Sequence, residues 1–190
     1  MAADPPPTTA AKRAAKVKKG DKVLVIGASG AVGSAAVQIA KHAFGASVTG
    51  VTSRANADIV RSLGADEVID YAERDALLQR AAYDVVVDTV GDVTIARAWP
   101  ALKPRGRLVL VAGDVSQLLR MPFYALASDK KVVGGPSVPK TSDMAALRDM
   151  VQRGEFRPLV GRTFAFEQIG AAHEAVDSRH KRGSVVVKLV

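Results

Sequence analysis

Residues 22–33 read KVLVIGASGAVG, and this stretch decides the fold. Its first part, residues 22–27, is a short apolar run whose β-branched side chains favour a strand buried on both faces. Apolar residues then recur at helical spacing over residues 31–44, and Gly45 follows where a helix commonly ends. The stretch therefore predicts a strand, a glycine-containing turn and a helix.

The same alternation continues outward along the chain. Strands joined by helices of about ten residues need crossover connections, which are right-handed and make the strands parallel. The fold class predicted is α/β, a Rossmann doubly wound parallel sheet with helices on both faces. The further predicted strands are 47–52, 67–70, 84–89, 107–112 and 131–134, and the further predicted helices are 55–63, 72–81 and 94–102.

Composition along the chain predicts three parts. Residues 1–20, rich in Ala, Pro, Thr and Lys, are typical of a flexible linker or tail. Residues 21–140 form the predicted Rossmann domain. Residues 141–190 are predicted as a C-terminal extension that packs on the sheet or beside a second domain. Its predicted elements are a helix at 143–153, a strand at 162–166, a helix at 167–178 and a strand at 184–190.

The composition excludes several classes of protein. The 190 residues include no cysteine, which excludes a disulfide scaffold, a thiolate zinc site and a cysteine nucleophile. Apolar runs stay far below the ~18 residues of a membrane span, so we expect none and expect a cytoplasmic location. Net charge is +8, but the basic residues crowd the two ends without aromatic neighbours, which leaves nucleic acid as a minor alternative.

The turn after the first strand is the first candidate site. Backbone N–H groups and a helix N-terminus can bind a pyrophosphate where no bulky side chain intervenes. Ala28 stands where the GxGxxG pattern has its first glycine, so this turn must tolerate a methyl group. The candidate pyrophosphate-binding residues are Gly27, Ser29, Gly30, Ala31, Val32 and Gly33.

The end of the second predicted strand indicates which dinucleotide binds. NAD-binding folds place an Asp or Glu here, about twenty residues after the last glycine, to bind the ribose hydroxyls. This chain has Thr52, Ser53 and Arg54 instead, and the next acid is Asp58. A hydroxyl and a guanidinium suit a 2'-phosphate. We therefore predict NADP as the cofactor, with Ser53 and Arg54 among its ligands.

The ends of the fourth and fifth strands are predicted to receive the nicotinamide, because ligands of such sheets lie at the carboxyl ends of the strands near the switch point. Small side chains and backbone groups there leave room for the ring. The candidate residues are Asp88, Val90, Val111, Ala112 and Gly113.

Longer runs carry a family resemblance. Over residues 18–190 the chain resembles the quinone oxidoreductase (zeta-crystallin-like) branch of the medium-chain dehydrogenase/reductases. The runs that carry it are GDKVLV at 20–25, GASGAVG at 27–33, VQIAK at 37–41, LGADEVIDY at 63–71, YDVVVD at 83–88, LKPRGR at 102–107, AAHEA at 171–175 and RGSVVV at 182–187.

The resemblance implies NADPH as hydride donor, a quinone or conjugated carbonyl compound as acceptor, no catalytic zinc, and a homodimer formed through the cofactor domain. It also implies Tyr71 and Arg179 as partners of the 2'-phosphate. The branch often has a lysine after the second strand, where this chain has Arg54 and Asn56. Family members begin with a GroES-like substrate domain, and this chain starts close to the junction that follows it.

Two functions remain open at this stage. The first is an NADPH-dependent oxidoreductase present as its cofactor-binding part, with no side chain assigned as catalytic. His42 and His173 lie in predicted helical or apolar stretches, where a packing or surface role is commoner. The alternative is a dinucleotide-binding module without turnover that serves as a sensor or interaction subunit.

Overall fold

A parallel sheet forms the centre of the computed structural model, which describes residues 17–111, 124, 128–134, 141–178 and 181–189. Its strand order is β3-β2-β1-β4-β5-β6, and all neighbours are parallel. The order reverses between β1 and β4, which places the switch point at the carboxyl end of β1. The strands are β1 (Lys22–Ile26), β2 (Ser47–Thr52), β3 (Glu67–Asp70), β4 (Tyr83–Asp88), β5 (Leu102–Leu110) and β6 (Lys131–Gly134).

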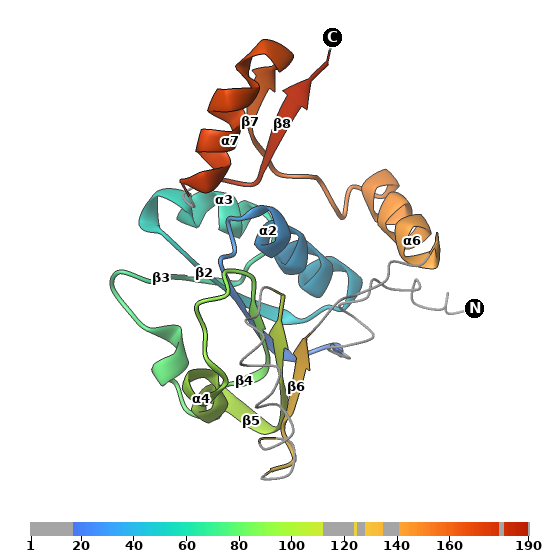
Figure 1. Cartoon of the computed structure of the whole chain (residues 1–190). Coiled ribbons are helices and arrows are strands. Elements are labelled where there is room, and N and C mark those ends of the chain that lie inside the picture. Colours follow the sequence, from blue (N-terminus) through green and yellow to red (C-terminus); the bar gives the residue numbers. More distant parts are fainter. Residues whose placement is uncertain (1–16, 112–123, 125–127, 135–140, 179–180, 190) are drawn as a thin grey trace, which may run out of the picture.

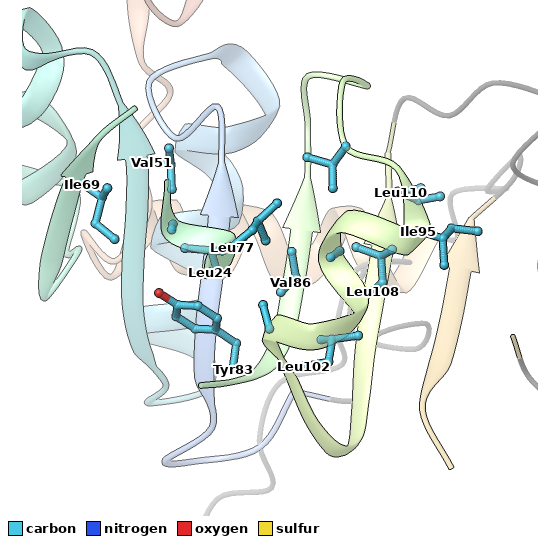
Figure 2. Packing of buried hydrophobic residues seen from close by; sticks show 14 residues of the cluster. Leu24, Val51, Ile69, Leu77, Tyr83, Val86, Ile95, Leu102, Leu108 and Leu110 are labelled. Carbon is cyan, nitrogen blue, oxygen red and sulfur yellow. The ribbon is translucent and has the colours of Figure 1, made fainter. Parts of the chain in front are cut away.

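Helices cover both faces of this sheet (Figure 1). Alternate residues of β1 show why, because Val23 and Val25 pack with side chains of α2 and α3, while Leu24 packs with Leu77 and Ile95 on the other face. Figure 2 shows the cluster that contains Leu24, Leu77 and Ile95. The predicted fold class is confirmed. The helices next to the sheet are α2 (Ala31–Gln38), α3 (Ala57–Ser62) and α4 (Ile95–Ala98).

One predicted helix, at 72–81, is wrong. Only a 3-10 turn at Ala76–Leu78 forms there. The Asp70 side chain accepts a hydrogen bond from the Ala72 amide, and the Asp75 side chain accepts one from the Leu77 amide, both at 3.0 Å. Short acidic side chains that bind nearby backbone amides compete with helical hydrogen bonding, and here they hold the chain in turns.

The other elements lie where the sequence predicted them, and β2, β3 and β6 also have the predicted bounds, while several others begin or end at different residues. The first helix is α-helical only to Gln38 and continues as a π-helical turn over Ile39–Ala43. The fifth strand begins at Leu102 instead of residue 107, and its pairing with β4 shifts register between Tyr83 and Val85. The shift accompanies Pro104, Gly106 and a left-handed Arg105 with φ of 59°.

The C-terminal elements are α6 (Thr141–Gln152), β7 (Val160–Ala165), α7 (Ile169–Asp177) and β8 (Ser184–Lys188). Strands β7 and β8 make a parallel sheet of their own against which α7 packs, and we call β7, α7 and β8 the C-terminal unit. Figure 1 shows α7, β7 and β8 beyond α2 and α3. The division of the chain at residue 140 stays a prediction, and most of the predicted tail at 1–20 lies outside the described residues. No helix in the described ranges has the length and apolarity needed to cross a membrane.

Candidate cofactor-binding site

The glycine turn lies where β1 ends beside the switch point. The amides of Gly27 and Ala28 donate to Val51 O of β2 at 3.1 and 3.0 Å, and Gly27 has a φ of 80°. A Cβ on Gly33 would lie 2.0 Å from Gly27 O, so α2 approaches the turn as closely as only glycine allows. The helix and the turn are therefore in close contact.

Gly50 explains how the turn tolerates Ala28. The Ala28 side chain is fully buried, and a Cβ on Gly50 of β2 would lie 3.1 Å from the Ala28 Cβ. The same Cβ would lie 2.6 Å from Val60 Cγ1 of α3. The missing side chain on β2 thus makes room for the methyl group, while the backbone of the turn keeps its conformation.

The first turn of α2 offers free backbone donors. Gly30 precedes the helix without a side-chain cap, and the first helical hydrogen bond runs from the Ser34 amide to Gly30 O at 2.9 Å. The amides of Val32 and Gly33 have no acceptor among the described residues, whereas the parallel bridge between Gly30 and Gly183 engages the Ala31 amide. Unpaired N–H groups at a helix N-terminus suit an anionic group such as a pyrophosphate.

A polar network joins this turn to the end of β2. Thr52 Oγ1 donates to Ser29 Oγ at 2.8 Å, and Asn56 Nδ2 lies 3.3 Å from Ser29 Oγ and 3.2 Å from Ser53 Oγ. Asn56 in turn accepts from Arg182 Nε at 2.8 Å. The sequence did not single out Asn56 and Arg182 as site residues, because they belong together only in the fold.

Arg54 and Tyr71, which are also predicted to bind the 2'-phosphate, lie near the end of β2. Arg54 pairs with Glu73 at 3.3 Å, and both side chains are largely exposed, so the pair is weak. The Tyr71 amide donates to Thr52 O at 3.2 Å, which brings the exposed Tyr71 side chain to the end of β2. Arg179 lies outside the described residues. Contact of any of these residues with a cofactor stays a prediction.

The ends of β4 and β5 lie beside the glycine turn. Thr89 Oγ1 donates to Ile26 O at 2.7 Å, and a Cβ on Gly27 would lie 2.6 Å from Val90 Cγ2. The Val111 amide donates to Asp88 O at 3.0 Å, and Val90 and Val111 are each about half exposed. Both strand ends therefore carry a partly exposed apolar side chain, and a contact of either with the nicotinamide stays a prediction. Ala112 and Gly113 lie outside the described residues.

The Asp88 side chain is fully buried inside the protein at the end of β4 and is not exposed at this edge of the sheet. It accepts hydrogen bonds from the amides of Val90, Gly91 and Val93 at 3.0, 3.1 and 3.2 Å. The carboxylate therefore holds the loop that carries Val90. A direct contact between Asp88 and a ribose stays a prediction.

Neither described histidine lies at this edge. A Cβ on Gly64, which precedes β3, would lie 3.0 Å from His42 Nε2, so His42 lies at the amino ends of the strands. His173 is exposed on α7. The described residues contain no group of three or more His, Asp or Glu side chains placed to hold a metal ion, and the chain has no cysteine.

Comparison with known proteins agrees with this geometry. Residues 63–187 match the family model described as zinc-binding dehydrogenase. The acryloyl-coenzyme A reductase of Sulfurisphaera tokodaii is 33% identical over 180 residues, which are 93% of this chain and 53% of that protein. The mouse NAD(P)H oxidoreductase RTN4IP1, a mitochondrial protein, is 33% identical over 90% of this chain and 49% of its own length.

The fold comparison extends over nearly the whole chain. The structure of the quinone oxidoreductase from Coxiella burnetii superimposes with a TM-score of 0.83 at 31% identity, over 95% of this chain and 56% of that one. The chain spans about half the length of the curated relatives it matches. Although the family description mentions zinc, the described residues of this chain offer no zinc site. Sequence and fold together show that the chain belongs to the medium-chain dehydrogenase/reductases, a family of NAD(P)-dependent oxidoreductases.

Proposed function

We propose that this chain binds NADP(H) and serves as the cofactor-binding part of an enzyme that reduces a quinone or a conjugated carbonyl compound. The observation that carries the proposal is the pair of unpaired amides at Val32 and Gly33, beside a turn that only glycine at position 33 allows. These donors lie at the carboxyl end of β1, where sheets of this type bind dinucleotides.

The choice of NADP over NAD rests on the end of β2. Thr52, Ser53 and Arg54 carry no carboxylate that would accept hydrogen bonds from the ribose hydroxyls. The hydroxyl groups of Ser29 and Ser53 lie within one hydrogen-bonded network there, and Arg54 adds an exposed guanidinium. Hydroxyl donors beside a guanidinium suit a phosphate.

The acceptor is proposed from chemistry and from the relatives. Acryloyl-coenzyme A contains a carbon–carbon double bond conjugated to a thioester carbonyl, and quinones share the conjugated carbonyl. When bound, NADPH would supply the hydride for such an acceptor. The part of this chain is to bind and orient: the amides of α2 hold the pyrophosphate, and Val90 and Val111 line the space for the ring. The cytoplasm remains the proposed location, although several relatives are mitochondrial.

Calorimetric titration with NADPH and NADH tests the proposal. We expect NADPH to bind at least about tenfold more tightly than NADH, a difference of about 1.4 kcal/mol. Steady-state oxidation of NADPH with 1,4-benzoquinone then separates an enzyme from a binding module. Tight binding without turnover at saturating cofactor would favour the module, and failure to bind either dinucleotide would overturn the proposal.

Arg54 offers a test at one residue. Replacing Arg54 with Glu removes a donor and adds repulsion, so we expect the Kd for NADPH to rise about 10-fold or more and the Kd for NADH to change little. Arg61→Glu is the matched control, because Arg61 is also exposed and pairs with Asp58 on α3. Equal losses for both cofactors in Arg54→Glu would exclude contact with the 2'-phosphate.

A homodimer through the cofactor domain is proposed from the edge of the sheet. Strand β6 pairs with β5 and with no other strand in the described part of the chain. An edge strand leaves backbone N–H and C=O groups available to a second strand. Light scattering during gel filtration should give twice the chain mass of 19.9 kDa. A monomer mass at micromolar concentration would contradict this assembly.

A further inference from the structure

Asn56 connects three parts of the chain that are far apart in sequence. Its Nδ2 is within hydrogen-bond distance of Ser29 Oγ in the glycine turn and Ser53 Oγ after β2, and its Oδ1 accepts from Arg182 Nε at 2.8 Å. Arg182 Nη2 also lies 3.5 Å from Ala55 O. The start of the C-terminal strand therefore brings a guanidinium to the end of β2.

The backbone fixes this guanidinium in place. The Gly183 amide donates to Ser29 O at 2.8 Å, and Gly183 pairs with Gly30 in an isolated parallel bridge. Gly183 has a φ of 56°, and a Cβ there would lie 2.1 Å from Leu159 O, so only glycine fits. Because Gly183 is held between the turn and residue 159, the residue before it is held beside Asn56.

The charge of Arg182 is not neutralised. Its side chain donates to the amide oxygen of Asn56 and, at the longer distance of 3.5 Å, to the backbone oxygen of Ala55. No Asp or Glu among the described residues forms an ion pair with it. Arg54, by contrast, already faces Glu73. A guanidinium has five N–H donors, so several on Arg182 stay available to an anion. The adjacent hydroxyl groups of Ser29 and Ser53 can donate to the same anion.

We propose that Arg182, oriented by Asn56, is a specificity-determining residue that binds the 2'-phosphate of NADP. This inference rests on the proposed function and assigns its phosphate to a residue of the C-terminal unit. It also has a structural consequence. Because only Gly183 separates Arg182 from β8, a phosphate bound there ties the start of β8 to the end of β2, so NADPH stabilises the C-terminal strand pair and NADH does so much less.

Binding of NADPH and NADH to Arg182→Met tests the contact. The variant keeps much of the side-chain length and removes the charge, so we expect the Kd for NADPH to rise about 10- to 100-fold and that for NADH to change less than about twofold. Lys188→Met is the matched control, since it removes one exposed positive charge at the far end of β8. Arg182→Lys, which keeps charge without the planar fork, should lie between wild type and Arg182→Met.

Hydrogen exchange supplies a readout that does not depend on affinity alone. In the wild type, saturating NADPH should slow exchange in β8 more than saturating NADH does, and Arg182→Met should abolish the difference. Equal weakening of both cofactors would show a structural role and overturn the inference. NADPH-selective binding that is unchanged in Arg182→Met would overturn it and leave the proposed function standing. A folded wild type that binds neither dinucleotide would overturn both.

Discussion

Gly33 is the residue on which the geometry of the turn depends most. An Ala side chain there would place its Cβ 2.0 Å from Gly27 O and 2.7 Å from Gly27 C, and both are backbone atoms that cannot rotate away. We expect Gly33→Ala to lower the free energy of unfolding by about 1–3 kcal/mol, because α2 must move from the turn. The same shift should weaken NADPH and NADH equally, as measured by urea unfolding and calorimetry.

Gly170 on α7 gives the control for this substitution. A Cβ there meets no atom within 4 Å, so Gly170→Ala should be neutral or should stabilise the protein by up to about 1 kcal/mol through helix propensity. If Gly33→Ala unfolded and bound cofactor like the wild type, the close approach of α2 to the turn would be refuted.

The glycine turn and the contact between Asn56 and Arg182 differ in how far the sequence could predict them. The glycine turn could be predicted because strand, glycines and helix are contiguous. Arg182 could not, because it lies 126 residues from Asn56 and its place depends on Gly183 meeting the turn. Asp88 was predicted at the right strand end, but burial beneath three amides decides its side-chain environment, and no local pattern reveals that.

Element by element, the strands were the most predictable part. Apolar runs such as those of β1 and β4, which are largely buried, leave few alternatives to a parallel strand. The strands β2, β3 and β6 also have the predicted bounds. The helix predicted at 72–81 does not form, although the apolar residues there have helical spacing, because the side chains of Asp70 and Asp75 compete with helical hydrogen bonding. Their carboxylates bind the amides of Ala72 and Leu77, which a count of apolar residues does not register.

Asp84 ties three strands together and makes stability depend on pH. Its Oδ2 accepts from the Lys22 amide of β1 at 2.8 Å and from Lys103 Nζ of β5 at 2.6 Å. Burial alone would raise the pKa of Asp84, but the hydrogen bonds from Lys103 and Lys22 outweigh it and lower the pKa below its ordinary value. The stabilisation is therefore present above an unfolded pKa of about 3.9 and is lost as pH falls through the lower folded pKa.

Asp84→Asn tests this dependence. We expect it to lower the free energy of unfolding by about 1 kcal/mol at pH 7 and to flatten the loss of stability below about pH 4, measured by urea unfolding across pH. Asp58→Asn is the control, because Asp58 is exposed beside Arg61 and should leave the slope as in the wild type. If the free energy of unfolding fell equally steeply below about pH 4 in both variants, the role of Asp84 would be contradicted.

At the scale of the whole molecule, the central sheet and the C-terminal unit differ in burial. The sheet has apolar clusters on both faces, whereas β7, β8 and α7 bury little more than Phe164 and Ala172. A sheet of two strands is marginal without a cover. The unit is attached to the central sheet through the Gly183 amide, which donates to Ser29 O. The segment before β7 is attached through the buried side chain of Gln38, whose Nε2 donates to Arg157 O and whose Oε1 accepts from the Arg157 amide.

Phe164 and Phe166 make a matched pair for measuring this difference. Phe164 is 7% exposed and Phe166 is 51% exposed, two residues further along the chain. Phe164→Ala should destabilise the C-terminal unit by about 3 kcal/mol through the cavity it leaves, and Phe166→Ala should cost well under 1 kcal/mol. Hydrogen exchange of residues 160–188 measures both, and binding of the dye ANS should rise in the first variant and fall in the second. Similar losses in the two variants would mean that Phe166 is covered in solution, for example by a second chain, because an uncovered phenyl ring has little packing to lose.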